Sequence, residues 1–350
     1  MRNVKEPLIW ENNKLKLIDQ RKLPHEEVYI EYSTHEGAFD GIRLMVVRGA
    51  PLIGFAGLYG MVLYSINHPK STVEDFNKAA DYLNEARPTA VNLSFELERT
   101  KTLAASYFEK NNSLEGLTAE LLKMATESFQ ELADNNLKMA KSAMKELEGL
   151  YGTRKLNVIT LCNTGYLACG PMGTALGVIA HLHENDRIEH VYASETRPYL
   201  QGGRLTAYEL CQLNVPHSLI VEGAFSYLMK NKKIDAIFIG ADRIVLNGDT
   251  ANKVGSSTLS IVAKNYGVPF YVVAPTSSFD FAAKTGEEIE IEMRPEEEIL
   301  SCQGVRIAPK DSRALNPSFD VTDHENISGI FCEKGIIKPV DSENVSKVCL

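Results

Sequence analysis

Short apolar runs alternate with helical patterns beyond Lys155. Each run has the length of a strand buried on both faces, and a stretch with helical apolar spacing follows it. We expect strands at Asn157–Leu161, His190–Ala193, Ser218–Val221, Ala236–Ile239 and Phe270–Ala274, and helices at Thr174–His183, Leu205–Leu213, Gly223–Lys230 and Ser256–Tyr266. This alternation predicts an α/β fold with a Rossmann-like, doubly wound parallel sheet.

The first half of the chain has a different pattern, with two short strands and then helices. Alternation at Lys14–Asp19 and Val28–Tyr32 predicts a small N-terminal sheet. Helical spacing follows at Thr34–Ala56 (interrupted at Arg48-Gly-Ala-Pro51), at Ser71–Ala86, from Arg87 through Leu97, and at Ser113–Leu150. We expect a smaller, mostly helical N-terminal domain at 1–112, a linking helical segment at 113–150 and a Rossmann-like catalytic domain at 151–345. The last ten residues are expected to form a loose polar tail.

Composition supports a two-domain globular protein, because 350 residues exceed one ordinary core. A net charge of −9 argues against a broad nucleic-acid-binding surface and leaves a local basic pocket open. No apolar run approaches the roughly 20 residues that span a bilayer, and the first residues lack the apolar core of a signal peptide. The six cysteines are scattered without a CxxC motif, which favours free thiols in a reducing cytoplasm.

The stretch Asp235–Lys253 is the first candidate for chemistry. Gly240 ends an apolar strand and delivers Asp242 at its carboxyl end, the edge of an α/β sheet where ligands bind. Asn252 and Lys253 precede an expected helix start, and helix starts attract anions. This set suits a polar, anionic substrate. A structural βα loop, held by an Asp242–Arg243 pair, explains the pattern equally well.

Two further groups follow strands at the same expected edge. Cys162 ends the first strand of this half, where its thiol suits an acid or base role. A small buried hydrophobe is the simpler explanation for a single free cysteine. Gln201 and Arg204 follow the second strand and suit hydroxyl or phosphate groups, with Glu195 orienting an arginine. A polar loop held by its own salt bridges is the alternative.

Two arginines resemble each other in context. Arg48 and Arg87 each precede a proline near an expected helix start, and Gly49 allows a ligand close to the main chain. Together with Lys253 they suggest a phosphate pocket. Solvated arginines at helix breaks are the alternative.

Metal and nucleotide sites find little support. His181 and His183 lie two apart on an expected helix, so they point in different directions. Gly170, Gly173 and Gly177 do not match a GxGxxG turn after the first strand. We therefore expect no metal and no cofactor.

Six motifs together resemble one family. They are RGAPLIG at Arg48–Gly54, RPTAVNL at Arg87–Leu93, CNTG at Cys162–Gly165, ETRPYLQGGRLTA at Glu195–Ala207, GADRIVLNGDTANK at Gly240–Lys253 and NPSFDVT at Asn316–Thr322. The set, in this order over nearly the whole chain, is similar to the methylthioribose-1-phosphate isomerase family. That family shares its fold with the regulatory subunits of the exchange factor for translation initiation factor two.

The resemblance implies an aldose–ketose isomerase of methionine salvage that acts on a sugar 1-phosphate. It implies Cys162 and Asp242 as the catalytic pair. It implies a substrate-binding set of Arg48, Gly49, Ala50, Arg87, Gln201, Asn252 and Lys253. It further implies a homodimer that needs no metal or nucleotide.

The chain departs from the family pattern at three places: Leu52, the run Tyr166-Leu-Ala-Cys169 and the run Glu222-Gly-Ala224. Two substrates therefore stay open, 5-methylthioribose 1-phosphate and 5-deoxyribose 1-phosphate. Ribose 1,5-bisphosphate fits less well, because the residues expected around the 5-position are mostly apolar: Leu52, Tyr166, Leu167 and Met172. A regulatory subunit that binds a sugar phosphate without turnover is the rival from another class.

Overall fold

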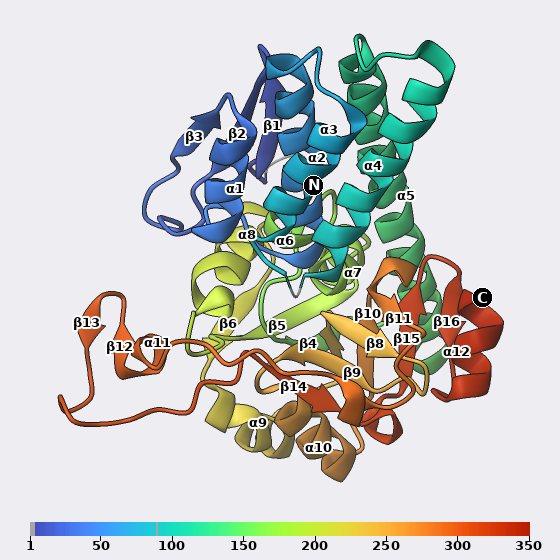
Figure 1. Ribbon diagram of the computed structural model, residues 1–350. Helices are drawn as coiled ribbons and strands as arrows, with labels where there is room; N and C mark the ends of the chain where they lie inside the picture. Colours follow the sequence, from blue (N-terminus) through green and yellow to red (C-terminus); the bar gives the residue numbers. More distant parts are fainter. Residues whose placement is uncertain (1–3, 89) are drawn as a thin grey trace. The chain divides into compact units, whose positions relative to one another are not determined.

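The computed structural model describes residues 4–88 and 90–350 (Figure 1). These residues fall into two compact units. Unit 1 contains Asn135–Gly165 and Thr174–Leu350, and unit 2 contains Val4–Asp134 and Tyr166–Gly173. The division runs through α5 (Leu117–Tyr151), the helix in the expected linking segment.

Unit 1 is built on a seven-stranded sheet with the order β16-β15-β10-β7-β4-β5-β6. The strands are β4 (Leu156–Thr160), β5 (Ile188–Ser194), β6 (His217–Ile220), β7 (Ala236–Ile239), β10 (Phe270–Val273), β15 (Gly329–Cys332) and β16 (Gly335–Ile337). All neighbouring pairs are parallel except β15 and β16. The chain adds strands outward from β4 through β5 to β6, then returns to β7 on the other side. The predicted parallel sheet is confirmed, and its order reverses between β4 and β7.

Helices of unit 1 follow its strands as the alternation predicts. They are α7 (Ala175–Glu184), α8 (Ala207–Gln212), α9 (Phe225–Asn231) and α10 (Ser256–Tyr266). A π-helical segment, Gly202–Thr206, leads into α8. β7 is buried along its whole length, as expected for a strand covered on both faces.

A second, four-stranded sheet in unit 1 has the order β11-β8-β9-β14. Its strands are β8 (Arg243–Val245), β9 (Thr250–Lys253), β11 (Phe279–Asp280) and β14 (Phe319–Thr322). The stretch after β7 is therefore a hairpin, β8–β9, and not a plain βα loop. Its turn is the expected Asn-Gly-Asp run, with Gly248 at φ 92°.

The expectation of a loose C-terminal tail is wrong. Ser342–Cys349 forms the helix α12, and Asp341 caps it by accepting a hydrogen bond from the Asn344 N–H at 2.7 Å. Val345 and Cys349 are buried in the core of unit 1. Polar residues dominate α12, but these two inward positions fix it to the protein.

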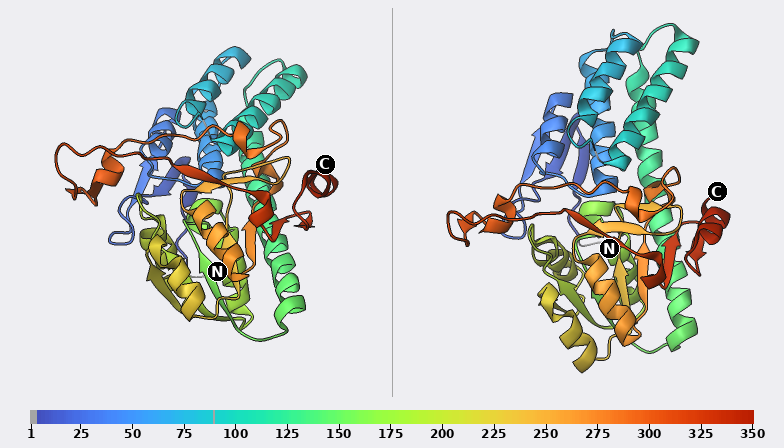
Figure 2. Two further views of the ribbon diagram at one scale, coloured as in Figure 1. Left: turned by 90° about the horizontal axis from the view of Figure 1, so that it is seen from below. Right: turned by 60° about the horizontal axis from the view of Figure 1, so that its bottom comes forward.

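One segment of unit 1 projects from the sheet in all views (Figure 2). It carries α11 (Glu297–Leu300) and a small hairpin of β12 (Ser301–Cys302) and β13 (Val305–Arg306). Three arginine–glutamate pairs hold the segment together: Arg294–Glu298, Arg306–Glu297 and Arg313–Glu296.

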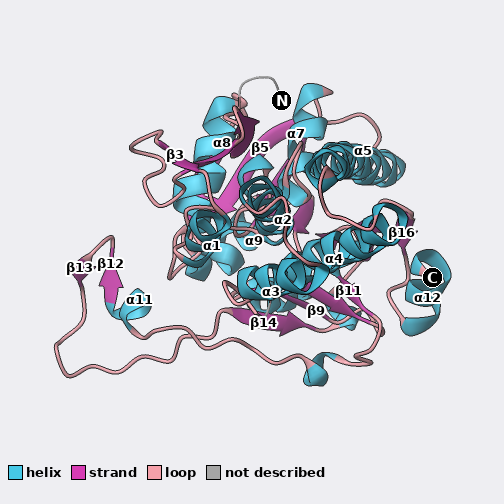
Figure 3. Ribbon diagram, turned by 45° about the horizontal axis from the view of Figure 1, so that its top comes forward, coloured by secondary structure: helices cyan, strands magenta, loops and turns pink. Residues whose placement is uncertain are grey.

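Unit 2 packs helices around α2 (Ala50–Asn67), which lies among α1 (His35–Arg43), α3 (Val73–Asn84) and α4 (Val91–Asn111) (Figure 3). The predicted N-terminal sheet is confirmed in β2 (Lys14–Ile18) and β3 (Tyr29–Tyr32), with β1 (Leu8–Glu11) as an additional strand. The expectation that no apolar run approaches the length of a membrane span is corrected at one helix. Among the described helices, α2 alone is long and apolar enough to cross a membrane, and 83% of its residues are buried inside the protein. Such burial is typical of a core helix.

Candidate active site

Cys162 and Asp242 follow the two neighbouring strands at which the sheet order reverses. β4 and β7 are parallel, with Thr160 opposite Phe238, and Thr160 Oγ1 donates a hydrogen bond to the Phe238 carbonyl at 2.9 Å. A Cβ on Gly240 would lie only 2.7 Å from Thr164 Cγ2, so the two loops pack tightly against each other. The prediction that both residues lie at one edge is confirmed. In α/β sheets, ligands bind at this switch point.

The main chain of Cys162 is held on both sides by threonine hydroxyls. Its N–H donates to Thr196 Oγ1 at 2.9 Å, and its carbonyl accepts from Thr206 Oγ1 at 2.5 Å. Next to it, Asn163 Nδ2 donates to Glu209 Oε1 at 2.7 Å, and Glu209 is fully buried. Sequence reasoning missed Thr196, Thr206 and Glu209, because nothing in their local pattern links them to Cys162. The cysteine is therefore set in a rigid, polar loop and is half-buried.

Asp242 is half-buried at the start of the β8–β9 hairpin. Its N–H donates to the Ala251 carbonyl at 2.9 Å, which ties this loop to β9. The neighbouring Arg243 forms an ion pair with Asp280 at 3.3 Å. The guanidinium of Arg243 is thereby directed to β11.

Gln201 combines deep burial with an unsatisfied acceptor. Its side chain is 4% exposed, and its Oε1 has no hydrogen-bond partner in the part of the chain that the structure describes. A buried acceptor without a donor costs about 1–3 kcal/mol, so such an atom suits a ligand hydroxyl. The segment that follows is π-helical, a geometry frequent at functional sites.

The expected arginine partners of this loop have other contacts. Arg197 donates to the Ile299 carbonyl at 2.9 Å and so holds the projecting segment. Arg204 lies 4.7 Å above the ring of Tyr199. The charge of Arg197 also acts on Glu195: burial raises the pKa of the Glu195 carboxyl, and Arg197 opposes the rise.

Asn252 and Lys253 end β9 as expected, just before α10. Asn252 Nδ2 donates to Ser256 Oγ at 2.8 Å and is buried. Lys253 Nζ donates to the Ser318 carbonyl at 2.7 Å and lies 4.7 Å from the centre of the Phe319 ring. Both side chains thus stabilise the local structure, and their predicted ligand role comes in addition to these contacts.

The N-terminus of α10, a helix start that the sequence suggests as an anion site, contacts a carboxyl group of the same chain. Asp320 accepts hydrogen bonds from the N–H groups of Gly255 at 2.7 Å and Ser257 at 3.1 Å. Burial raises the pKa of the Asp320 carboxyl, and these main-chain bonds oppose the rise. Asp320 lies in the NPSFDVT motif, but the sequence alone does not predict this contact.

The remaining predicted residues belong to unit 2. Arg48 is buried just before α2, and Ala50 and Pro51 form the first turn of that helix. Gly49 has φ 92°, and a Cβ there would lie 2.4 Å from the Ala168 carbonyl oxygen. Glycine is therefore required at this position by both conformation and space.

Arg87 also precedes a helix, α4, whose first residue is Val91. Thr89, which lies between them, is outside the described residues. The ligand roles of Arg48, Gly49, Ala50 and Arg87 stay predictions.

Comparison with known proteins decides the family. Residues 46–339 match the Initiation factor 2 subunit family. The methylthioribose-1-phosphate isomerase of Thermoanaerobacter sp. (strain X514) is 46% identical over 345 residues, which cover 97% of each chain. The chain belongs to the methylthioribose-1-phosphate isomerase family.

Two solved structures resemble this family member along its whole length. The 5-methylthioribose 1-phosphate isomerase from Pyrococcus horikoshii OT3 is 37% identical, with a TM-score of 0.89 over 99% of this chain and 96% of that one. The translation initiation factor eIF-2B, subunit delta, from A. fulgidus is also 37% identical, with a TM-score of 0.85 over 99% of both chains. One of these proteins is named as an enzyme and the other as a subunit of a translation factor, so the fold alone does not distinguish an enzyme from a binding protein.

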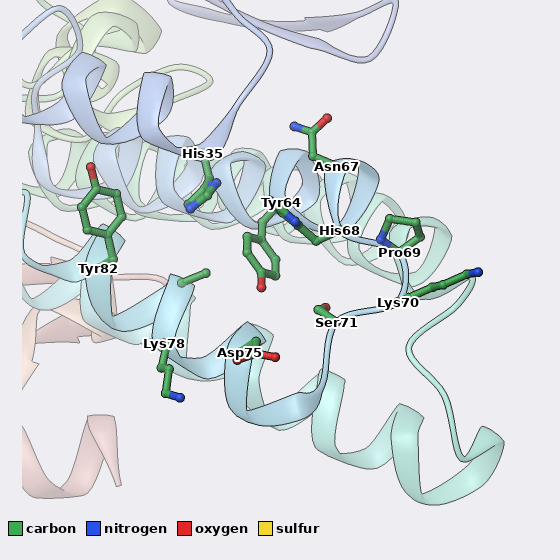
Figure 4. Close-up of a pocket in the computed structure, with 11 residues that line it drawn as sticks. His35, Tyr64, Asn67, His68, Pro69, Lys70, Ser71, Asp75, Lys78 and Tyr82 are labelled. Carbon is green, nitrogen blue, oxygen red and sulfur yellow. The ribbon is translucent and has the colours of Figure 1, made fainter.

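This methylthioribose-1-phosphate isomerase family member gathers no three His, Cys, Asp or Glu side chains as a metal site within residues 4–88 and 90–350. Unit 2 does contain a pocket of about 720 Å³ (Figure 4). Its lining residues come from α1, the end of α2, the loop after α2, and α3: His35, Tyr64, Asn67, His68, Pro69, Lys70, Ser71, Asp75, Lys78, Ala79 and Tyr82. The predicted site residues are not among the residues that line this pocket.

Proposed function

We propose that the protein is an aldose–ketose isomerase of methionine salvage. Its preferred substrate is 5-methylthioribose 1-phosphate, which it converts to the ribulose 1-phosphate isomer. The observation that carries the proposal is the position of Cys162 and Asp242 after β4 and β7, at the switch point of the sheet. The substrate assignment is supported by the name of relatives that are 43–46% identical over nearly the whole chain.

The chemistry assigns different roles to the two side chains. A phosphate on C1 blocks the usual opening of the sugar ring, so the enzyme must help the ring oxygen to leave. Asp242, as the acid, gives that oxygen a proton. Cys162 then moves the proton from C2 to C1, or stabilises the charge while hydride passes between these carbons. In either route the C2 hydroxyl loses its proton as C2 becomes the carbonyl carbon. That proton balances the one given to the ring oxygen and restores the acid form of Asp242.

Isotope labelling separates these two routes. Substrate deuterated at C2 loses the label to water if Cys162 transfers a proton through solvent-exchangeable groups. Full retention of the label in the product indicates a hydride shift.

The uncharged 5-position of the substrate follows from the residues expected around it. Leu52 and Leu167 are fully buried, and Tyr166 is half-buried with a pKa that burial raises to about 12. A second phosphate among such groups would lose its hydration without gaining a cation. We therefore place 5-deoxyribose 1-phosphate second and ribose 1,5-bisphosphate last.

A regulatory subunit without turnover is the second candidate function. The 37% identity to the protein named eIF-2B, subunit delta, favours it specifically. Against it stands the presence of both Cys162 and Asp242 after the switch-point strands. A purified protein that binds sugar 1-phosphates but does not isomerise them would establish this alternative.

We also propose that the protein works as a homodimer in the cytoplasm, without a metal, a nucleic acid or a membrane as partner. All six cysteines are free thiols, as expected in a reducing compartment. The net charge of −9 opposes nucleic-acid binding. Sedimentation analysis at several protein concentrations tests the dimer.

Substitution of the two proposed catalytic residues tests the mechanism. Asp242→Asn keeps the shape and removes the acid, so kcat should fall about 10²-fold or more. Cys162→Ser keeps the shape but binds its proton far more tightly, and it should be similarly impaired. Variants within a few-fold of the wild type would remove these groups from the mechanism.

A further inference from the structure

Cys162 and Thr196 share an unusual main-chain conformation and contact each other. Their φ angles are 66° and 63°, in the left-handed region that non-glycine residues seldom adopt. The Cys162 N–H donates to Thr196 Oγ1 at 2.9 Å, and this hydroxyl in turn donates to the Ser194 carbonyl at 3.1 Å. Ser194 and Thr196 are fully buried. The hydroxyl orientation is thus fixed by one donor and one acceptor.

Glu222 holds the other side of this loop. One carboxylate oxygen, Oε1, accepts from the Thr196 N–H at 2.6 Å and also from the Ser194 hydroxyl. Hydrogen bonds to a carboxylate are stronger than those between neutral groups. A continuous chain of contacts therefore runs from the Glu222 carboxylate through Thr196 to the main chain of Cys162.

Unfavourable backbone conformations persist only where surrounding contacts hold them, and they gather at functional sites. We propose that Thr196 and Glu222 are positioning residues for the Cys162 thiol: Glu222 fixes Thr196, and Thr196 fixes the loop that carries the thiol. The inference rests on the proposed function, in which Cys162 acts on the sugar. Neither residue needs to touch the substrate for this role.

Three substitutions test the proposal, with one control. Thr196→Val keeps the shape of the side chain but cannot accept the hydrogen bond from the Cys162 N–H, whereas Thr196→Ser retains the hydroxyl that accepts it. Glu222→Gln keeps an acceptor but removes the charge. The control is Thr322→Val, because Thr322 is equally buried and its Oγ1 has no hydrogen-bond partner among the described residues.

The first readout is steady-state kinetics with 5-methylthioribose 1-phosphate. A displacement of a reacting group by about 1 Å can reduce the rate by about 10²-fold. Thr196→Val should lower kcat by about 10- to 100-fold and change KM by less than about 3-fold. Glu222→Gln should act in the same direction with a smaller loss. Thr196→Ser and Thr322→Val should stay within about 3-fold of the wild type.

The second readout does not need a substrate. Iodoacetamide alkylates thiols, and peptide mass spectrometry reports each cysteine separately. Cys211 is exposed and serves as the internal reference. Thr196→Val should change the alkylation rate of Cys162 and the pH profile of that rate, while Cys211 reacts as in the wild type.

The outcomes separate the two hypotheses. Unchanged kcat and unchanged Cys162 alkylation in folded Thr196→Val would overturn the positioning role, as would a loss of kcat with unchanged alkylation. If Thr196→Val does not fold, Glu222→Gln with wild-type Cys162 reactivity would overturn the role of Glu222. A fully active Cys162→Ser, together with Cys162 alkylation that still depends on Thr196, would contradict the proposed function and leave the positioning intact.

Discussion

Glu209 lies so close to Gly165 that a Cβ on the glycine would stand 2.3 Å from Glu209 Oε2. Gly165 ends the CNTG turn that carries Cys162, and the same carboxylate group accepts a hydrogen bond from Asn163. The absence of a side chain at Gly165 therefore allows a buried carboxylate to hold the turn.

Gly165→Ala should disrupt this arrangement. The added methyl group forces Glu209 away from Asn163 and leaves buried polar groups with poor partners. We expect the free energy of unfolding to fall by about 2–4 kcal/mol, with loss of isomerase activity. Gly149→Ala is the control, since a Cβ at that exposed helical position would meet nothing within 4 Å. Urea denaturation that shows equal stability for the two variants would contradict the contact.

Asp249 should make stability depend on acid pH. Burial alone would raise the pKa of its carboxyl, but hydrogen bonds from Asn247, His324 and Gly286 outweigh it and lower the pKa. Because the pKa is lower in the folded protein, the ionised carboxyl stabilises the folded state at pH values above the unfolded-state pKa of about 3.9. This contribution is lost as the pH falls through the pKa of the folded state.

Asp249→Asn should therefore destabilise the protein by about 2–3 kcal/mol at pH 7. The difference from the wild type should shrink below about pH 4. Thermal unfolding between pH 3 and pH 7 measures it, with the exposed Asp311→Asn as the control. A difference that grows toward low pH would contradict the assigned direction.

The sequence predicts the large sheet well because its strands are strong local signals. Ala236–Ile239 is apolar throughout and buried throughout, and Ser256–Tyr266 begins and ends at glycines with positive φ, Gly255 and Gly267. By contrast, β8 and β9 are equally short but contain the polar residues Arg243, Asn252 and Lys253, so no continuous apolar run marks them. The helix α12 was mistaken for a loose tail because only two of its side chains, Val345 and Cys349, are buried, so its sequence is mostly polar.

The candidate site divides in the same way. The shared position of Cys162 and Asp242 at one edge of the sheet could be predicted because both follow strands, and strand ends have a known place in parallel sheets. Glu209 could not, since it meets Asn163 only through a contact between residues 46 positions apart. Asp320 could not either: its bond to Gly255 depends on β14 lying beside β9.

The C-terminal helix should contribute to stability. Asp341→Ala removes the cap of α12 and should cost about 1 kcal/mol. Deletion of residues 342–350 should cost more, because it also uncovers the core around Val345. Urea denaturation of both variants measures the two costs. A deletion with wild-type stability would mean that α12 does not pack on the core.

The phosphate role of the arginines has a direct test. Arg48→Met and Arg87→Met keep much of the side-chain length and remove the charge, so each should weaken binding of inorganic phosphate and substrate together. Lys5→Met, a substitution at an exposed ion pair, serves as the control. Calorimetry with unchanged phosphate affinity in both arginine variants would exclude these residues as phosphate ligands.

Turnover of three sugars tests the central claim most directly. The wild-type protein is assayed side by side with 5-methylthioribose, 5-deoxyribose and ribose 5-phosphate, each carrying the 1-phosphate, and ketose formation is measured. An apolar contact is worth only about 1–3 kcal/mol, so the first two substrates should differ by no more than roughly 200-fold in kcat/KM. The bisphosphate should be far poorer, because its second phosphate finds no cation. The bisphosphate as the best substrate, or no turnover of any of the three, would contradict the account.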